Sequence, residues 1–205
     1  MKTLRKIALL SIPLAFLLAG VGVLWLLNVK NAPGSFFERI ANNKDDWMGA
    51  HVVLLFSTVF LLPAAIGMRE AVTHKLIGTI ANVLVVIVGL TSILLAGQYA
   101  IDFVMPLLGE AGDDALKIHE LLFQSSLIKT LFYDLPNLAI LSLFLLSCTL
   151  FWSDKMPLKF NLILMVNWLI VLTGNLMDPL VQRIAILCLA FSFLPLVRAL
   201  WKDET

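Results

Sequence analysis

Seven polar residues of types that bind ligands recur near the predicted ends of apolar segments. They are His51, Gln98, Asp102, Tyr133, Asp134, Asn175 and Arg183. Their imidazole, amide, carboxylate, phenol and guanidinium groups can hold a small solute or an ion through hydrogen bonds and charge. Ionisable residues are costly inside a membrane helix, so they usually face the bundle interior or water. The pattern predicts a polar cavity that opens to one side of a membrane.

The same residues have a structural interpretation, because helix ends are where polar side chains reach headgroups and water. Asp134 could cap the helix that follows it, and Asp178 could cap the last helix. Arg183 could neutralise either aspartate as a structural pair. Both interpretations stay open for the set.

A metal site is another chemistry that these residue types allow, with His51, Asp102 and His119 as candidate ligands. A catalytic zinc needs three protein ligands and an open position, and no compact ligand motif supplies them. His119-Glu120 lacks a second histidine four positions after the first. Haem held by His51 and His119 is an alternative. The sequence leaves the cofactor and any catalytic residue unknown, since it also lacks nucleophile-elbow, phosphate-loop and dinucleotide signatures.

The composition indicates that lipid is the solvent for most of the chain. Of 205 residues, 60% are hydrophobic and 14% are charged, and the mean hydropathy is +0.94. Soluble domains carry about 25% charged residues. A chain this short cannot bury so much apolar surface within itself. The net charge of +1, with no basic cluster, argues against a nucleic-acid partner.

A helix needs roughly 20 apolar residues to cross the bilayer core, and we identify six such runs. The runs are continuously apolar, without the alternation of a membrane barrel strand, so the predicted fold class is all-α. We expect one transmembrane helical domain over residues 1–205. The predicted spans are about 7–28, 49–68, 77–104, 131–152, 158–177 and 181–200.

Basic residues flanking the spans favour an orientation with both ends of the chain in the cytoplasm. That orientation places nine of the 15 basic residues inside and six outside. The six outside are Lys30, Arg39, Lys44, Lys117, Lys129 and Arg183. The seven candidate residues then lie toward the outer side. We expect a multi-pass protein of a bacterial inner membrane.

Short interfacial helices are expected in the outer loops. Ser35 and Glu38 have the spacing of a capping box, which predicts a helix start after Pro33-Gly34. Residues 113–131 carry an apolar face and a face with His119, so they form either an interfacial linker or a lid. Gly20 and Gly22 could allow a close helix crossing or a dimer contact, and Asn167 should hydrogen-bond to another helix.

Three classes of function remain, and the sequence resembles no family that would choose among them. The first is an outward-facing site for a small solute or ion, which is the expectation that we carry forward. The second is a membrane enzyme, metal-dependent or not, that acts on a lipid or a periplasmic group. The third is a structural or regulatory subunit whose polar residues meet a membrane partner, or a second copy of the chain.

Overall fold

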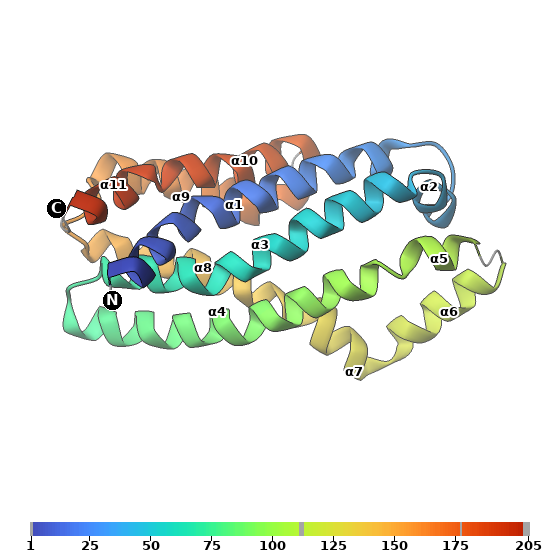
Figure 1. Ribbon diagram of the computed structural model, residues 1–205, viewed down its shortest axis with the longest axis horizontal. Helices are drawn as coiled ribbons and strands as arrows, with labels where there is room; N and C mark the ends of the chain where they lie inside the picture. The colour runs from blue at the N-terminus through green and yellow to red at the C-terminus, as the bar shows by residue number, and fades with distance from the viewer. Residues whose placement is uncertain (1, 111–112, 177, 203–205) are drawn as a thin grey trace.

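The computed structural model describes residues 2–110, 113–176 and 178–202, and every regular element in those ranges is helical (Figure 1). The all-α prediction is therefore confirmed for this part of the chain. The longer elements are α1 (Lys2–Asn31), α3 (Lys44–Glu70), α4 (Lys75–Asp102), α8 (Asn137–Thr149), α9 (Leu158–Leu172), α10 (Pro179–Ser192) and α11 (Leu194–Lys202). The shorter elements are α2 (Phe36–Asn42), α5 (Met105–Glu110), α6 (Asp113–Gln124), α7 (Ser126–Lys129), the π-helix η1 (Thr130–Asp134) and the 3₁₀ turns η2 (Leu150–Trp152) and η3 (Gly174–Leu176).

Five helical stretches of the described chain are long and apolar enough to cross a membrane. They are Thr3–Asn31, Lys44–Glu70, Lys75–Leu108, Ser126–Trp152 and Pro179–Lys202. The fifth predicted span contains α9, which is apolar but has only 15 residues. At 1.5 Å per residue it is about 22 Å long, which is less than the ~30 Å hydrocarbon layer.

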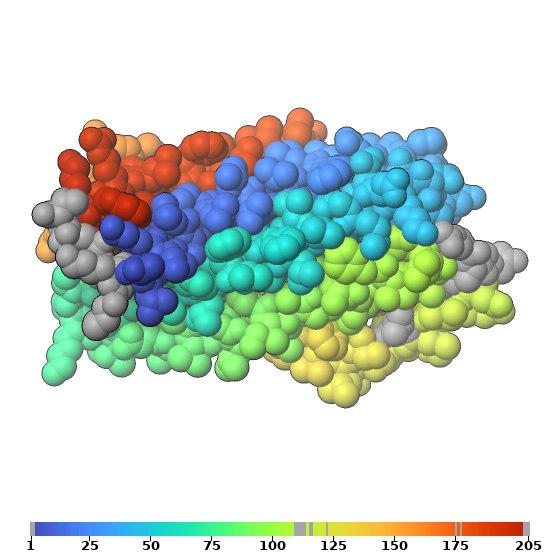
Figure 2. All heavy atoms as spheres, viewed as in Figure 1, coloured from blue at the N-terminus to red at the C-terminus, as the bar shows by residue number. Residues whose placement is uncertain are grey.

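Six helices form a closed ring in which each packs against its neighbours. The order around the ring is α1, α3, α4, α8, α9 and α10, and α10 returns to α1. Figure 1 shows both termini at one end of this bundle, which we call the terminal end. The opposite end, which we call the far end, carries α2, α5 and α6. Figure 2 shows α1, α3 and α4 side by side along one face of the molecule.

Two glycines of α1 let neighbouring helices approach closely, as their spacing predicts. A Cβ added at Gly20 would lie 2.8 Å from the Cα of Leu187 in α10. A Cβ added at Gly22 would lie 2.6 Å from the side chain of Leu54 in α3. The two glycines therefore fix the separation of α1 from both helices that flank it, inside one chain.

Aromatic packing and two cross-helix hydrogen bonds hold the ring together at its centre. Phe16 stacks on Phe193 and meets Trp168 edge to face. The Trp168 indole donates to the Ser147 hydroxyl at 2.9 Å, which joins α9 to α8. The Asn167 amide donates to the Ser192 hydroxyl at 2.7 Å, which joins α9 to α10 and confirms the predicted role of Asn167.

Two arginines at the terminal end are matched with acceptors. Arg5 pairs with Glu70 at 2.6 Å. Arg69 donates from Nε to the Asn82 amide oxygen at 2.6 Å and from Nη1 to the Val72 carbonyl at 3.0 Å. These contacts join α1 to α3 and α3 to α4.

Candidate functional site

The hairpin from α1 to α3 forms one wall of the far end, and its geometry follows from local sequence. Gly34 has φ of +108°, which turns the chain after α1. The Ser35 hydroxyl then accepts from the Glu38 N–H, and the Glu38 carboxylate accepts from the Ser35 N–H at 2.7 Å. These bonds are the predicted capping box, so that prediction is confirmed. Hydrogen bonding to the Ser35 backbone N–H, and to a lesser extent to the Ser35 side chain, holds the pKa of the Glu38 carboxyl below its ordinary value.

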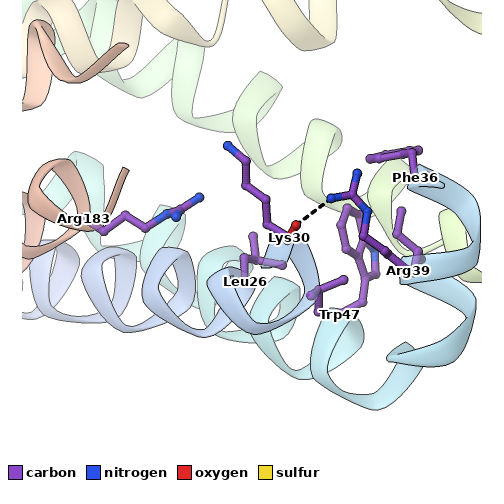
Figure 3. A pocket seen from close by; sticks show the side chains of 8 residues that line it. Leu26, Lys30, Phe36, Arg39, Trp47 and Arg183 are labelled. Carbon is purple, nitrogen blue, oxygen red and sulfur yellow. Dashed lines mark hydrogen bonds between the residues drawn. The ribbon is translucent and has the colours of Figure 1, made fainter. Parts of the chain in front are cut away.

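Helix α2 is docked by a small apolar cluster and by an arginine. Ile40 is buried against Val29 of α1 and Met105 of α5. Arg39 donates from Nη1 to the Lys30 carbonyl oxygen at 2.6 Å, which satisfies a carbonyl in the last turn of α1. The docking leaves the Arg39 guanidinium and the Lys30 ammonium at the edge of the same hollow (Figure 3).

This hollow, the cationic pocket, has a volume of about 240 Å³ and lies between α1, α2, α3 and α10. Its cations are Lys30, Arg39 and Arg183, and its other walls are Leu26, Val29, Phe36, Ile40 and Trp47. Figure 3 shows the three cationic side chains extending toward the same space. The described residues that line it include no carboxylate. An apolar wall with three converging cations is suited to an anion.

Arg183 is the most unusual group in the cationic pocket. Its Nη1 atom is buried and has no hydrogen-bond partner among the described residues. Nearly all buried polar groups in proteins are hydrogen-bonded, and a buried donor without a partner costs about 1–3 kcal/mol, more when it is charged. The sequence analysis allowed Arg183 to form a structural ion pair with Asp134 or with Asp178, and in the structure Arg183 pairs with neither. Asp178 instead caps α10 by accepting from the Leu180 N–H at 2.7 Å.

A second polar cluster lies beside the cationic pocket and shares Trp47 with it. His51 of α3 and Asp102 of α4 approach to 3.4 Å between Nε2 and Oδ2, with side chains only 3% and 15% exposed. Tyr133 of η1 donates to the other Asp102 oxygen at 3.4 Å. The Trp47 indole donates to the Asp102 carbonyl oxygen at 2.8 Å, which fixes the end of α4 against the start of α3.

The hydrogen-bond geometry of His51 shows how this cluster holds a proton. Nδ1 lies 2.7 Å from the Trp47 carbonyl oxygen, which can only accept, so Nδ1 carries a hydrogen. Nε2 then faces Asp102.

Aromatic contacts continue from this cluster to α6 and back to α2. Tyr133 lies 4.6 Å from Phe123 between ring centroids, and Phe123 lies 4.5 Å from His119. His119 meets the edge of Phe37 at 5.3 Å. Phe36 lies between His119 and Trp47, at 5.8 and 6.3 Å. Helix α6 is therefore packed against α2 and η1 through His119 and Phe123, which places it over the far end.

The structure brings some predicted site residues together and leaves others apart. His51, Asp102 and Tyr133 meet, while Arg183 faces the neighbouring cationic pocket. Gln98 makes no hydrogen bond within the described residues. Asp134 lies in η1, and its side chain does not cap α8, whose N-cap is Pro136. Asn175 lies in η3, and its side chain is outside the described part of the chain.

The three candidate metal ligands do not converge. His51 and Asp102 are in contact, but His119 packs among Phe36, Phe37 and Phe123. Within the described residues, no group of three or more His, Cys, Asp or Glu side chains could hold a metal ion.

Sequence reasoning missed Lys30, Arg39 and Trp47 as site residues. Lys30 and Arg39 flank the Pro33-Gly34 turn, so a hairpin at that turn would have suggested that their charges lie close together. Trp47 looks like an interfacial anchor in the sequence, and its contacts with Asp102 and His51 depend on tertiary packing.

Comparisons with protein-family models, with curated proteins and with solved structures find no match to this chain. Function must therefore be argued from the site itself.

Proposed function

We propose that the chain is a six-span membrane protein that binds a small anionic solute in the cationic pocket, with the far end facing outward. The pocket carries this proposal, because it combines three cations with a buried Arg183 donor that lacks a partner. An anion with two or more oxygens would supply that acceptor and offset the repulsion between the cations. Arginine binds phosphate and carboxylate groups through paired N–H donors, which suits this role.

Six spans, rather than five, are supported by the position of α9. It packs between α8 and α10, so it lies among the spans and not on the bundle's surface. Both termini lie at one end, as an even number of passes requires (Figure 1). The excess of basic residues at that end favours a cytoplasmic terminal end. A bacterial inner membrane would be the corresponding location, with the cationic pocket open to the periplasm.

The experiment titrates inorganic phosphate into the protein in nanodiscs of zwitterionic lipid and measures binding by calorimetry. We expect saturable binding by the wild type and a loss of at least tenfold in affinity in Arg183→Gln. Arg198→Gln is the matched control, because Arg198 is an exposed arginine at the terminal end. Phosphate binding that is absent from the wild type, or unchanged in Arg183→Gln, would contradict the proposal.

A membrane enzyme is the second candidate, and the orientation of His51 favours it. The Trp47 carbonyl fixes the hydrogen on Nδ1 and turns Nε2 toward Asp102, as in sites where histidine transfers a proton. The His51 side chain is 3% exposed, so a substrate would have to displace part of the packing around it. Retention of phosphate binding by His51→Gln would separate this function from the anion site.

A further inference from the structure

A second cavity lies at the centre of the bundle, on the side of the cationic pocket that faces the terminal end. It has a volume of about 120 Å³, and every helix of the six-membered ring contributes to its wall. Phe16, Ser57, Tyr99, Leu143, Trp168 and Leu189 represent the six helices in turn. The wall is almost wholly apolar, and the Ser57 hydroxyl is already bonded to the Leu54 carbonyl at 2.6 Å.

An apolar cavity of this size does not hold water well. An engineered apolar cavity of about 150 Å³ stays dry and binds benzene, so a slightly smaller one suits a short alkyl segment. Voids of this kind reduce stability because the lining atoms lose contacts. An apolar ligand segment would restore them.

The cavity and the cationic pocket lie end to end on the same faces of two adjacent helices. On α1, Phe16, Ala19 and Val23 line the cavity, while Leu26 and Lys30 line the pocket. These five positions are separated by three or four residues, which places them on one face of the helix. On α10, Leu189 and Ile186 line the cavity, and Arg183, one turn toward the far end, lines the pocket.

We infer that the cationic pocket and the central cavity are the two parts of one site for an anionic amphiphile, a phosphate or carboxylate head with an apolar tail. The inference rests on the proposed function, because the pocket must bind the anionic head. It adds the class of ligand: the tail runs along the faces of α1 and α10 that line the cavity, from Arg183 toward Trp168. A membrane lipid and a water-soluble amphiphile share this chemistry.

The test compares inorganic phosphate with hexyl phosphate on the full chain in phosphatidylcholine nanodiscs. Hexyl phosphate should bind at least about 100-fold more tightly, since each buried methylene contributes roughly a factor of four and about three or four buried methylenes give this gain. Ala19→Phe, which fills the cavity, should remove this gain and leave phosphate binding intact. Val21→Phe is the control, because Val21 is 41% exposed on the outside of the same helix. Retained phosphate binding also shows that each variant is folded.

The two proposals fail in different ways. Equal affinity for the two probes in the wild type, or a chain-length gain that survives Ala19→Phe, would overturn the amphiphile site alone. The proposed function would be overturned if the wild type did not bind phosphate, or if Arg183→Gln bound it with unchanged affinity. Nanodiscs that also contain phosphatidic acid identify the source: competition with hexyl phosphate indicates a membrane lipid, and unchanged affinity indicates a water-soluble amphiphile.

Discussion

Arg5 and Arg69 at the terminal end differ from Arg183 at the far end in whether an acceptor meets the guanidinium group. At the terminal end, Arg5 and Arg69 each have an acceptor at 2.6 Å. At the far end, Arg183 has a buried nitrogen without a partner, beside Lys30 and Arg39. Matched charges fix helices to one another, whereas unmatched charges at a pocket are available to a ligand. Under the proposed function, this contrast distinguishes structural from ligand-binding polar residues in a chain where both kinds lie at helix ends.

The terminal end also has a hollow, and its charged groups differ from those of the cationic pocket. A surface hollow of about 660 Å³ at the terminal end is larger than the cationic pocket. Asp154 lies in its wall together with Arg198, and Lys155 and Lys202 of the same wall have interaction partners. Among the described residues at the terminal end, the Asn161 amide oxygen is also buried without a hydrogen-bond partner. The Asn161 amide nitrogen, however, donates to the carbonyls of Leu150 and Met156.

The largest effect is expected where the far end does hold a matched pair. His51→Leu removes one of the two partners of the Asp102 carboxyl group, leaving the Tyr133 hydroxyl, and leaves the Trp47 carbonyl without its side-chain donor. We expect unfolding free energy in mixed micelles, measured by SDS titration, to fall by about 3 kcal/mol, the lower end for breaking a buried pair. Asp102→Asn retains hydrogen-bonding atoms and should lose less. Equal losses would show that packing, rather than the pair, is what His51 supplies.

Arg69→Gln tests the matched end. The shorter amide cannot reach both the Asn82 oxygen and the Val72 carbonyl, so we expect a loss of about 2 kcal/mol of unfolding free energy. The same SDS titration measures it. Arg198→Gln, an exposed control, should change the value by less than about 0.5 kcal/mol.

Whereas Arg69→Gln should lower the unfolding free energy, Arg183→Gln should raise it when no anion is present. It removes a buried charged donor without a partner and reduces repulsion with Lys30 and Arg39, so unfolding free energy should rise by about 1 kcal/mol. With saturating phosphate, the wild type should instead have the higher unfolding free energy, because the ligand stabilises only the protein that binds it. A loss of stability in phosphate-free buffer would show that Arg183 is a structural residue like Arg69.

The smallest effect concerns the wall of the cationic pocket at low pH. The folded-state pKa of Glu38 lies below the ordinary value of 4.5, so its contribution to α2 is complete above that value. It is lost as the pH falls further, through the folded-state pKa. Amide hydrogen exchange in residues 35–42 should therefore rise, relative to the rest of the chain, below about pH 4. Glu38→Gln should exchange faster at neutral pH and lack this dependence.

Local patterns made much of the architecture predictable. The serine and glutamate of the capping box act over three residues, while the small residues of α1 and Asn167 of α9 act on an adjacent helix, a role that their residue types predict. The same reasoning named His51, Asp102 and Tyr133, but it could not show that they touch. The contacts of Asp102 with His51 and with Tyr133 join positions that are 51 and 31 residues apart in sequence.

The cationic pocket was harder to predict because its members are ordinary residues in isolation. Lys30 and Arg39 look like interfacial charges, and Arg183 looks like the partner of a nearby aspartate. Asp178, however, is occupied with its own helix start, five residues from Arg183 rather than the three or four that place side chains together. The absence of a partner can be recognised only when all neighbouring elements are in place.

The unequal lengths of the ring helices have a mechanical consequence for the bilayer. Helix α1 has 30 residues, about 45 Å, and α9 on the other side of α10 has 15, about 22 Å. In the proposed six-span arrangement, lipids beside α9 meet a hydrophobic wall thinner than their own core, while α1 must tilt or emerge into the headgroups. The protein should therefore thin the membrane on one flank, concentrate short-tailed lipids there and favour membranes of less than average thickness.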